Sequence, residues 1–309
     1  MRKSKKRHHW LIATTALLAL GACDKAGTNP TGTFGGADAA DPAQAKVDTY
    51  VEGYNKLIGT FGLPETADKY EEQDIPGKAA TDSIYVNTGW IDQALAKLKE
   101  ARALPGGPAD LDKAGDRLIA ALDTLLARLG PLHTYYESKA YKEDNLARGK
   151  SEHAQLMADF KAAMDSSEAF NALLKRERNA RTGIEIAELK KQGNTLGYTS
   201  KLALQKSEQL VDLFNKPEDI RNPAMIARGD SLVVEIEKLL AEQRAAFATA
   251  KAAAKSPADA PDISYSLLEG NLTSMVGNYR DMKQSHNVDA AKRLVDSYNE
   301  AVESMNRIR

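Results

Sequence analysis

From Val47 to Ile308, apolar residues recur at spacings of three and four, and this recurrence constrains the fold more than any other feature of the sequence. Such spacing lines apolar side chains along one face of an α-helix, whereas a half-buried strand needs strict alternation, which no stretch shows. Ala, Leu, Lys and Glu are abundant and favour helix. We therefore predict an all-α fold, an elongated bundle of about six to eight long antiparallel helices.

Separate apolar stripes indicate where these helices lie. They predict helices over residues 47–61, 84–98, 111–129, 156–215, 225–255, 263–282 and 288–308. Pro105–Pro108 is the sharpest break, and Gly130–Pro131 is expected to end the third helix because proline disrupts a helix interior. Gly193–Asn194 predicts a kink or break in the longest stripe. The polar stretch 65–81 shows little periodicity, and Trp90 is expected to anchor the core.

The first 22 residues have the pattern of an export signal. Five basic residues precede an apolar run of 11 residues, Trp10–Leu20, and the small residues Gly21 and Ala22 follow it. This order is typical of a cleaved leader. The run is too short for a spanning helix, which needs about 20 residues. We predict that residues 1–22 are a signal peptide.

The four residues Leu20–Cys23 resemble the lipobox of bacterial lipoproteins. The resemblance implies a diacylglyceryl group on the thiol of Cys23, cleavage before this residue and acylation of the new amino end. We therefore expect several acyl chains to hold the protein in a membrane, as stable anchoring requires. The alternative is a secretory signal with a chance cysteine. Cys23 is the only cysteine, so it has no partner for an internal disulfide.

Residues 24–43 are rich in Gly, Ala, Thr, Asp and Pro and have no apolar period, so we predict a flexible tether with a reach of roughly 25 Å. A helical body over residues 44–309 would follow it, in the periplasm of a bacterial cell envelope. Asp24 resembles an inner-membrane retention signal of enteric bacteria, but the choice between inner and outer membrane stays open.

The charge balance of the mature chain bears on its partners. Residues 1–22 hold five of the 42 basic residues and none of the 43 acidic ones, which leaves 37 positive and 43 negative charges, a net charge of −6. This balance disfavours nucleic acid as a partner. We expect a membrane, contacted through the lipid anchor, and an envelope protein or polymer as partners.

The most distinctive internal stretch is Tyr135–Asn145, which Gly149–His153 follows. It contains the patterns YY-x-x-K-x-Y-x-x-D and GK-x-x-H. With the lipoprotein leader, these resemble the YiiG-like family of bacterial lipoproteins over roughly residues 45–309. The resemblance implies an anchored helical domain in the cell envelope with no assigned function, and it supplies no catalytic residues.

This stretch admits two interpretations. Tyr135, Tyr136 and Tyr141, with Asp144 and His153, would form a binding surface for carbohydrate or peptide, because tyrosine offers a flat apolar face and a polar tip. Alternatively, the tyrosines pack where helices meet, and polar neighbours satisfy their hydroxyl groups. We favour packing.

The search for catalytic chemistry finds little. His133 and Glu137 are four residues apart and could share a helix face, but one such pair is weak evidence for a metal. No HExxH, P-loop or GxSxG motif is present, and acylation would exclude Cys23 as a nucleophile. We predict no catalytic residues, no metal and no cofactor, and hence a non-enzymatic binding or structural module. The alternative is a ligand carrier or enzyme with a pocket between helices near Tyr135–His153.

Overall fold

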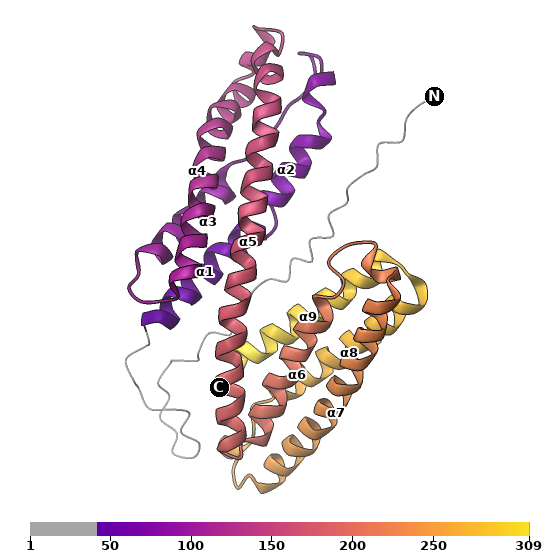
Figure 1. The fold of residues 1–309 in the computed structure, drawn as a ribbon. Helices are drawn as coiled ribbons and strands as arrows, with labels where there is room; N and C mark the ends of the chain where they lie inside the picture. The colour runs from indigo at the N-terminus through magenta and orange to yellow at the C-terminus, as the bar shows by residue number, and fades with distance from the viewer. Residues whose placement is uncertain (1–41, 309) are drawn as a thin grey trace. The chain divides into compact units, whose positions relative to one another are not determined.

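The computed structural model describes residues 42–308 (Figure 1). The predicted signal peptide and Cys23 lie outside the described residues, as does all of the predicted tether except Pro42 and Ala43, which begin the first helix. None of the helices within the described range combines the length and apolar character needed to cross a membrane.

The described residues form nine α-helices and four short 3₁₀ helices, with no strand, which confirms the predicted all-α class. The α-helices are α1 (Pro42–Ile58), α2 (Leu63–Glu72), α3 (Gly89–Ala103), α4 (Ala109–Glu137), α5 (Ala147–Lys191), α6 (Thr195–Val211), α7 (Pro223–Ala253), α8 (Ser264–Ser285) and α9 (Val288–Arg307). The 3₁₀ helices are η1 (Ile75–Gly77), η2 (Ala140–Lys142), η3 (Asp219–Arg221) and η4 (Pro257–Asp259).

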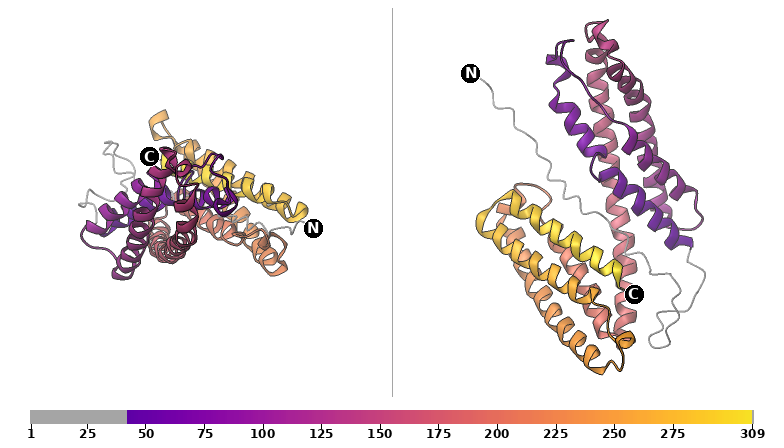
Figure 2. Two further views of the ribbon diagram at one scale, coloured as in Figure 1. Left: turned by 90° about the horizontal axis from the view of Figure 1, so that it is seen from above. Right: turned by 180° about the vertical axis from the view of Figure 1, so that it is seen from behind.

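The described helices belong to two compact units, an N-terminal unit that ends at Arg178 and a C-terminal unit that begins at Asn179. The boundary falls within α5. In the N-terminal unit, α3 packs along both α1 and α4 (Figure 2). Its core consists of fully buried apolar side chains, the largest of which are Tyr50, Leu57, Leu63, Tyr70, Ile75, Ile91, Leu98, Leu111, Phe160 and Phe170.

The C-terminal unit pairs α6 with α7 and α8 with α9 around a second core. An asparagine directly precedes three of its helices as the N-cap residue. The side-chain oxygens of Asn194, Asn222 and Asn287 accept hydrogen bonds from the first-turn N–H groups of α6, α7 and α9. Such caps satisfy N–H donors that the helix itself leaves unpaired. The helix bounds confirm the predicted break at Gly193–Asn194 and the last three predicted helices, α7, α8 and α9.

Three expectations about the region of α2 and α3 are wrong. The polar stretch after Gly62 contains α2, whose short buried face includes Leu63, Thr66 and Tyr70. The helix expected from Ile84 begins only at Gly89. Trp90 is 40% exposed, because the buried face of α3 is filled without it by residues such as Ile91, Ala94, Leu95 and Leu98.

Gly130–Pro131 does not end the third helix, since α4 continues to Glu137 with Pro131 inside it. Proline removes the bond that its N–H would donate to the carbonyl of Ala127. Ala127 is exposed, so water can solvate that carbonyl. Beyond the proline, Leu132 and Tyr136 are buried, and their burial favours continuation of the helix.

Candidate functional site

The tyrosines that the sequence singles out form a buried cluster. Tyr135 and Tyr136 lie in the last turn of α4, and Tyr141 lies in η2. Their ring centroids are 5.2 Å apart for the first two and 6.2 Å apart for each of them and Tyr141. All three side chains are buried. Their burial supports packing, while a binding surface made of these residues stays a prediction.

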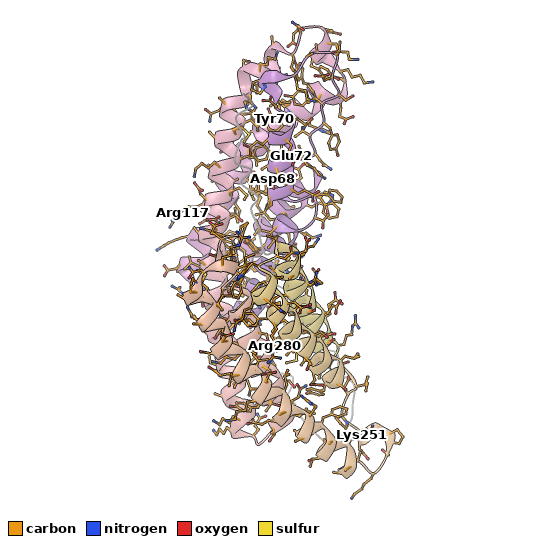
Figure 3. All side chains as sticks on the ribbon, turned by 90° about the vertical axis from the view of Figure 1, so that its right-hand side faces the viewer. Asp68, Tyr70, Glu72, Arg117, Lys251 and Arg280 are labelled. Carbon is orange, nitrogen blue, oxygen red and sulfur yellow. The ribbon has the colours of Figure 1, made fainter. Side chains whose placement is uncertain are left out.

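Asp144 and His153 extend this cluster in different ways. The Tyr135 hydroxyl donates a hydrogen bond of 2.7 Å to Asp144, and this bond is the main reason that the pKa of Asp144 is lowered. The pKa of Tyr135 is raised, mainly because the hydroxyl is buried and also because it binds the Asp144 carboxylate. The ring of His153 lies against that of Tyr70, with centroids 5.6 Å apart. Tyr70, which belongs to α2, is labelled in Figure 3. The structure thus joins Asp144 to the tyrosines and His153 to α2.

Residues 78–88, here called the connector, lead from η1 to α3 and are held by distant side chains. The Tyr141 hydroxyl donates a bond of 3.1 Å to the carbonyl of Asp82. The Nδ1 atom of His133 lies 2.7 Å from the carbonyl oxygen of Val86. Gln73 forms two bonds to the backbone of Tyr85, accepting from its N–H at 2.8 Å and donating to its carbonyl at 2.7 Å. The connector therefore has a fixed path.

That path creates a concave surface beside α2, which we call the aromatic groove. It has a volume of about 280 Å³ and is lined by Phe61, Glu65, Thr66, Lys69, Tyr85, Val86, Asn87 and Trp90. Its aromatic side chains face solvent, with Phe61 45%, Tyr85 54% and Trp90 40% exposed. Single exposed apolar residues are ordinary, but three large ones around one concavity make this surface the candidate site.

Local contacts bring Phe61, Lys69 and Trp90 together in the groove. The rings of Phe61 and Trp90 have centroids 6.2 Å apart and planes inclined at 31°. Lys69 Nζ lies 4.9 Å from the centroid of Phe61, a cation–π distance. These contacts hold an ammonium group and two aromatic faces side by side.

Glu65 completes this arrangement. One carboxylate oxygen lies 2.5 Å from Lys69 Nζ, and the other accepts a bond of 2.6 Å from the N–H of Phe61. The hydrogen bond from the Lys69 ammonium group is the main reason that the pKa of Glu65 is lowered, and the bond from the Phe61 N–H is the next. The side-chain oxygen of Asn87 accepts from the N–H of Gly89 at 2.9 Å, which leaves its NH₂ group for a ligand.

His133 and Glu137 are not arranged as a pair of metal ligands, because the Nδ1 atom of His133 is bonded to the backbone of the connector. Within residues 42–308 no group of three or more His, Cys, Asp or Glu side chains is placed to hold a metal ion.

Sequence reasoning missed the groove because its aromatic residues come from separate segments. The available signal was the run Tyr85–Trp90, in which two aromatic residues flank the polar and turn-forming residues Asn87, Thr88 and Gly89. The spacing of apolar residues from Ile84 to Leu98 instead predicts that this segment is part of a helical stripe.

Two comparisons with known proteins match this chain. A family model described as "Protein of unknown function (DUF3829)" matches residues 41–307. The chain is 27% identical over 213 residues to "Uncharacterized protein YiiG" of Escherichia coli (strain K12), which is 65% of this chain and 58% of that protein. It thus spans less than two thirds of that relative's length. No solved structure matches the chain.

Proposed function

The chain belongs to the DUF3829 family of proteins of unknown function, and from this premise we propose that it is a lipid-anchored cell-envelope protein whose helical body is a non-enzymatic binding module. We further propose that the aromatic groove is its binding site. The observation that carries the proposal is the gathering of Phe61, Tyr85 and Trp90, all substantially exposed, around one concave surface.

Aromatic side chains are effective in binding because each contributes a large apolar area with little loss of conformational freedom. The groove is also preorganised. Gln73 and His133 fix the connector, and Lys69 rests on Phe61 before any ligand arrives. Less free energy is then lost in ordering the site when a ligand binds.

The charged residues of the groove support binding rather than catalysis. Glu65 and Lys69 form an ion pair with each other, and the pKa of Glu65 is lowered. A general acid or base works best when its pKa lies near the working pH. The shift moves Glu65 away from neutral pH, so it is poorly suited to transfer protons there.

The proposed anchor rests on the leader and on the lipobox-like residues Leu20–Cys23. It would hold the body in the periplasm beside the inner or the outer membrane. The test is mass spectrometry and cell fractionation of the native chain and of Cys23→Ser. We expect a mature chain that begins at acylated Cys23 and stays with membranes, and a variant that loses the lipid. A native chain that retains residues 1–22 and a free thiol would contradict the anchor.

The alternative, a ligand carrier or enzyme with a pocket near Tyr135–His153, would need a cavity lined by those residues. The aromatic groove is lined by none of them. The buried tyrosines support the groove indirectly, through the bond from Tyr141 to the connector.

Site-specific crosslinking in intact cells tests the binding site without assuming a ligand. A photoreactive residue would replace Tyr85 in the groove, or Ile263, which is 64% exposed in the C-terminal unit, as the matched control. We expect discrete crosslinked species from position 85 that disappear in the Trp90→Ala background. No crosslinks from position 85, or species that are the same from both positions, would argue against the groove as a binding site.

A further inference from the structure

We propose that the aromatic groove binds an uncharged sugar ring within a glycan chain. The inference rests on the proposed binding function and adds the chemical class of the ligand. The size of the groove, its aromatic lining, its hydrogen-bonding groups and its charge together favour such a ligand.

The size of the groove limits what enters it. Sites for drug-sized ligands have volumes of about 300–1,000 Å³. At about 280 Å³, the groove lies just below this range, which suits a single ring-sized group. Because the lining aromatic residues are exposed, the groove opens to solvent. A chain can therefore place one unit in it and continue outside on both sides.

The apolar and polar parts of the groove match the two parts of a sugar. A pyranose ring presents a flat face of C–H groups, which packs on aromatic rings such as those of Phe61 and Trp90. Its rim carries hydroxyl groups, each of which both donates and accepts hydrogen bonds. The groove supplies an acceptor, the carboxylate of Glu65, and donors, the ammonium group of Lys69 and the NH₂ group of Asn87.

The charge of the groove favours an uncharged ligand. Glu65 and Lys69 neutralise each other across 2.5 Å, so neither sign of ligand charge finds an unpaired partner among the lining residues. At longer range, the net charge of −6 on residues 23–309 repels polyanions. An acidic polysaccharide is therefore a poorer ligand than a neutral one.

A proline-rich peptide is the main competing ligand, because such peptides also dock in aromatic grooves. Proline has no backbone N–H, so these segments offer mainly carbonyl acceptors. They would meet the donors of Lys69 and Asn87. They would add no donor to the Glu65 carboxylate, which can accept further hydrogen bonds beside those from the Phe61 N–H and Lys69. Sugar hydroxyl groups satisfy both kinds of group, and this difference favours the glycan.

Trp90 reports directly on the groove. The chain has two tryptophans, Trp10 and Trp90, so the full chain with Trp10→Phe has its only tryptophan in the site. The probes are tetramers of N-acetylglucosamine and of glucose, as two sources of uncharged rings, with a galacturonic acid tetramer and decaproline as contrasts. We expect a saturable change of Trp90 emission with at least one uncharged tetramer and none with the acidic tetramer or decaproline.

Variants separate the groove from the rest of the surface. Phe61→Ala and Tyr85→Ala each remove an exposed ring, so the fold should persist, as circular dichroism would check, while the affinity for the sugar falls about tenfold. Ile263→Ala, the matched control in the C-terminal unit, should leave the affinity unchanged. Equal affinities in all the variants would overturn the proposed site.

The outcomes distinguish this inference from the proposed function. If decaproline or the acidic tetramer changes Trp90 emission and neither uncharged tetramer does, the sugar is the wrong class and the groove remains a binding site. If no probe changes it but position 85 forms crosslinks to a protein in cells, the glycan is again overturned while the binding function stands. If no probe binds and no crosslinks form, both fail.

Discussion

His133 Nδ1 lies 2.7 Å from the carbonyl oxygen of Val86, so the last turns of α4 are bonded to the connector that lines the aromatic groove. A carbonyl oxygen only accepts, so Nδ1 carries the proton and the imidazole donates. Tyr141 forms a second bond of this kind, to Asp82. The histidine and tyrosine near the end of α4 therefore shape the groove without lining it.

Loss of the His133 bond is expected to loosen the connector. His133→Ala leaves the Val86 carbonyl without its donor, which costs about 1 to 3 kcal/mol. Urea unfolding would measure the cost, and hydrogen exchange over residues 78–88 would show the local loosening. His286→Ala is the matched control, because His286 Nδ1 approaches the carbonyl of Ile220 in the same way, at 3.3 Å, within the C-terminal unit. Unchanged exchange in the connector of His133→Ala would contradict this role.

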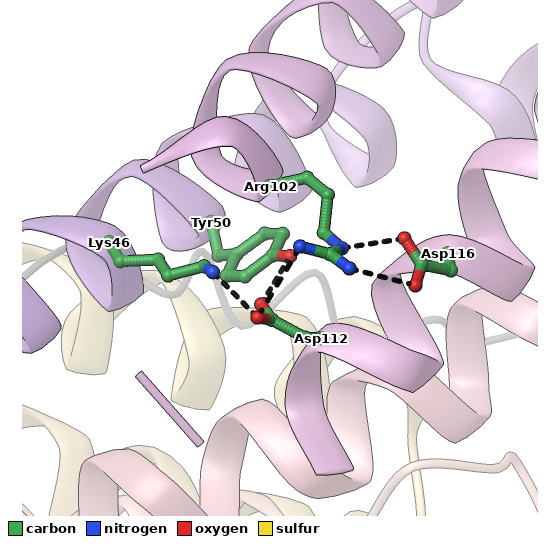
Figure 4. A network of polar contacts seen from close by, with 5 residues as sticks. All are labelled: Lys46, Tyr50, Arg102, Asp112 and Asp116. Carbon is green, nitrogen blue, oxygen red and sulfur yellow. Dashed lines mark hydrogen bonds and ion pairs between the residues drawn. The ribbon is translucent and has the colours of Figure 1, made fainter. Parts of the chain in front are cut away.

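Asp112 is expected to matter far more than Asp116, although both contact Arg102 (Figure 4). Asp112 also binds Lys46 at 2.6 Å, whose side chain is only 3% exposed, and accepts from the hydroxyl of Tyr50 at 2.9 Å. Asp112→Ala would leave a buried ammonium group unpaired and cost about 3 to 5 kcal/mol.

Asp116→Ala serves as the control, since its side chain is 53% exposed and the pair it forms is a surface pair, worth about 0 to 1 kcal/mol. Chemical denaturation of both variants would compare the free energies of unfolding. Equal losses of stability in the two variants would contradict the claim that burial of the Lys46 ammonium group requires the charge of Asp112.

Two glycines of α5 should respond oppositely to alanine. A Cβ at Gly149 would lie 2.8 Å from the Tyr136 hydroxyl and 2.9 Å from a methyl group of Leu146, both in buried residues. Gly149→Ala should therefore cost about 1 to 3 kcal/mol. A Cβ at Gly183 meets nothing within 4 Å, so Gly183→Ala should stabilise the helix by about 1 kcal/mol. Thermal melting tests the sign, and destabilisation by both substitutions would contradict the packing around Tyr136.

Asp230 is expected to make the stability of the C-terminal unit depend on pH. Its carboxylate lies 2.7 Å from Lys283 Nζ and accepts a bond of 3.0 Å from the Tyr279 hydroxyl. These two bonds, that of Lys283 more than that of Tyr279, lower the pKa of Asp230 below the unfolded value of about 3.9. A lowered pKa contributes stability that is present above the unfolded value and is lost as the pH falls through the folded value. Asp230→Asn should be less stable than the native chain at neutral pH, with a difference that shrinks on acidification below about pH 4. A difference that does not change with pH would contradict the assignment.

Local pattern was enough to predict most helices of this chain, because their buried faces repeat at helical spacing. It failed for α2, whose ten residues bury too few apolar side chains to show a period. It also failed at Pro131, because the burial of residues beyond the proline favours continuation of the helix. Both failures are cases in which packing across the structure outweighs a local signal.

The groove was beyond local pattern for a related reason. Its lining comes from residues 61–69, 85–87 and 90, and the connector is fixed by His133, which is 47 residues away from Val86 in the sequence. Trp90 looks like a core residue on a helical stripe, and only the three-dimensional arrangement shows it exposed. The tyrosines were conspicuous in the sequence, yet the structure buries them.

Hydroxyl-radical footprinting of the protein in intact cells and after purification tests most directly whether the groove is a binding site. Oxidation of Phe61, Tyr85 and Trp90 would be quantified by mass spectrometry, with the exposed Ile263 and Leu267 as internal references. We predict that the three aromatic residues are protected in cells relative to the purified protein, while the two references are oxidised equally in both. Equal oxidation of Trp90 and Tyr85 in cells and in the purified protein would contradict occupation of the groove, and with it the proposed function.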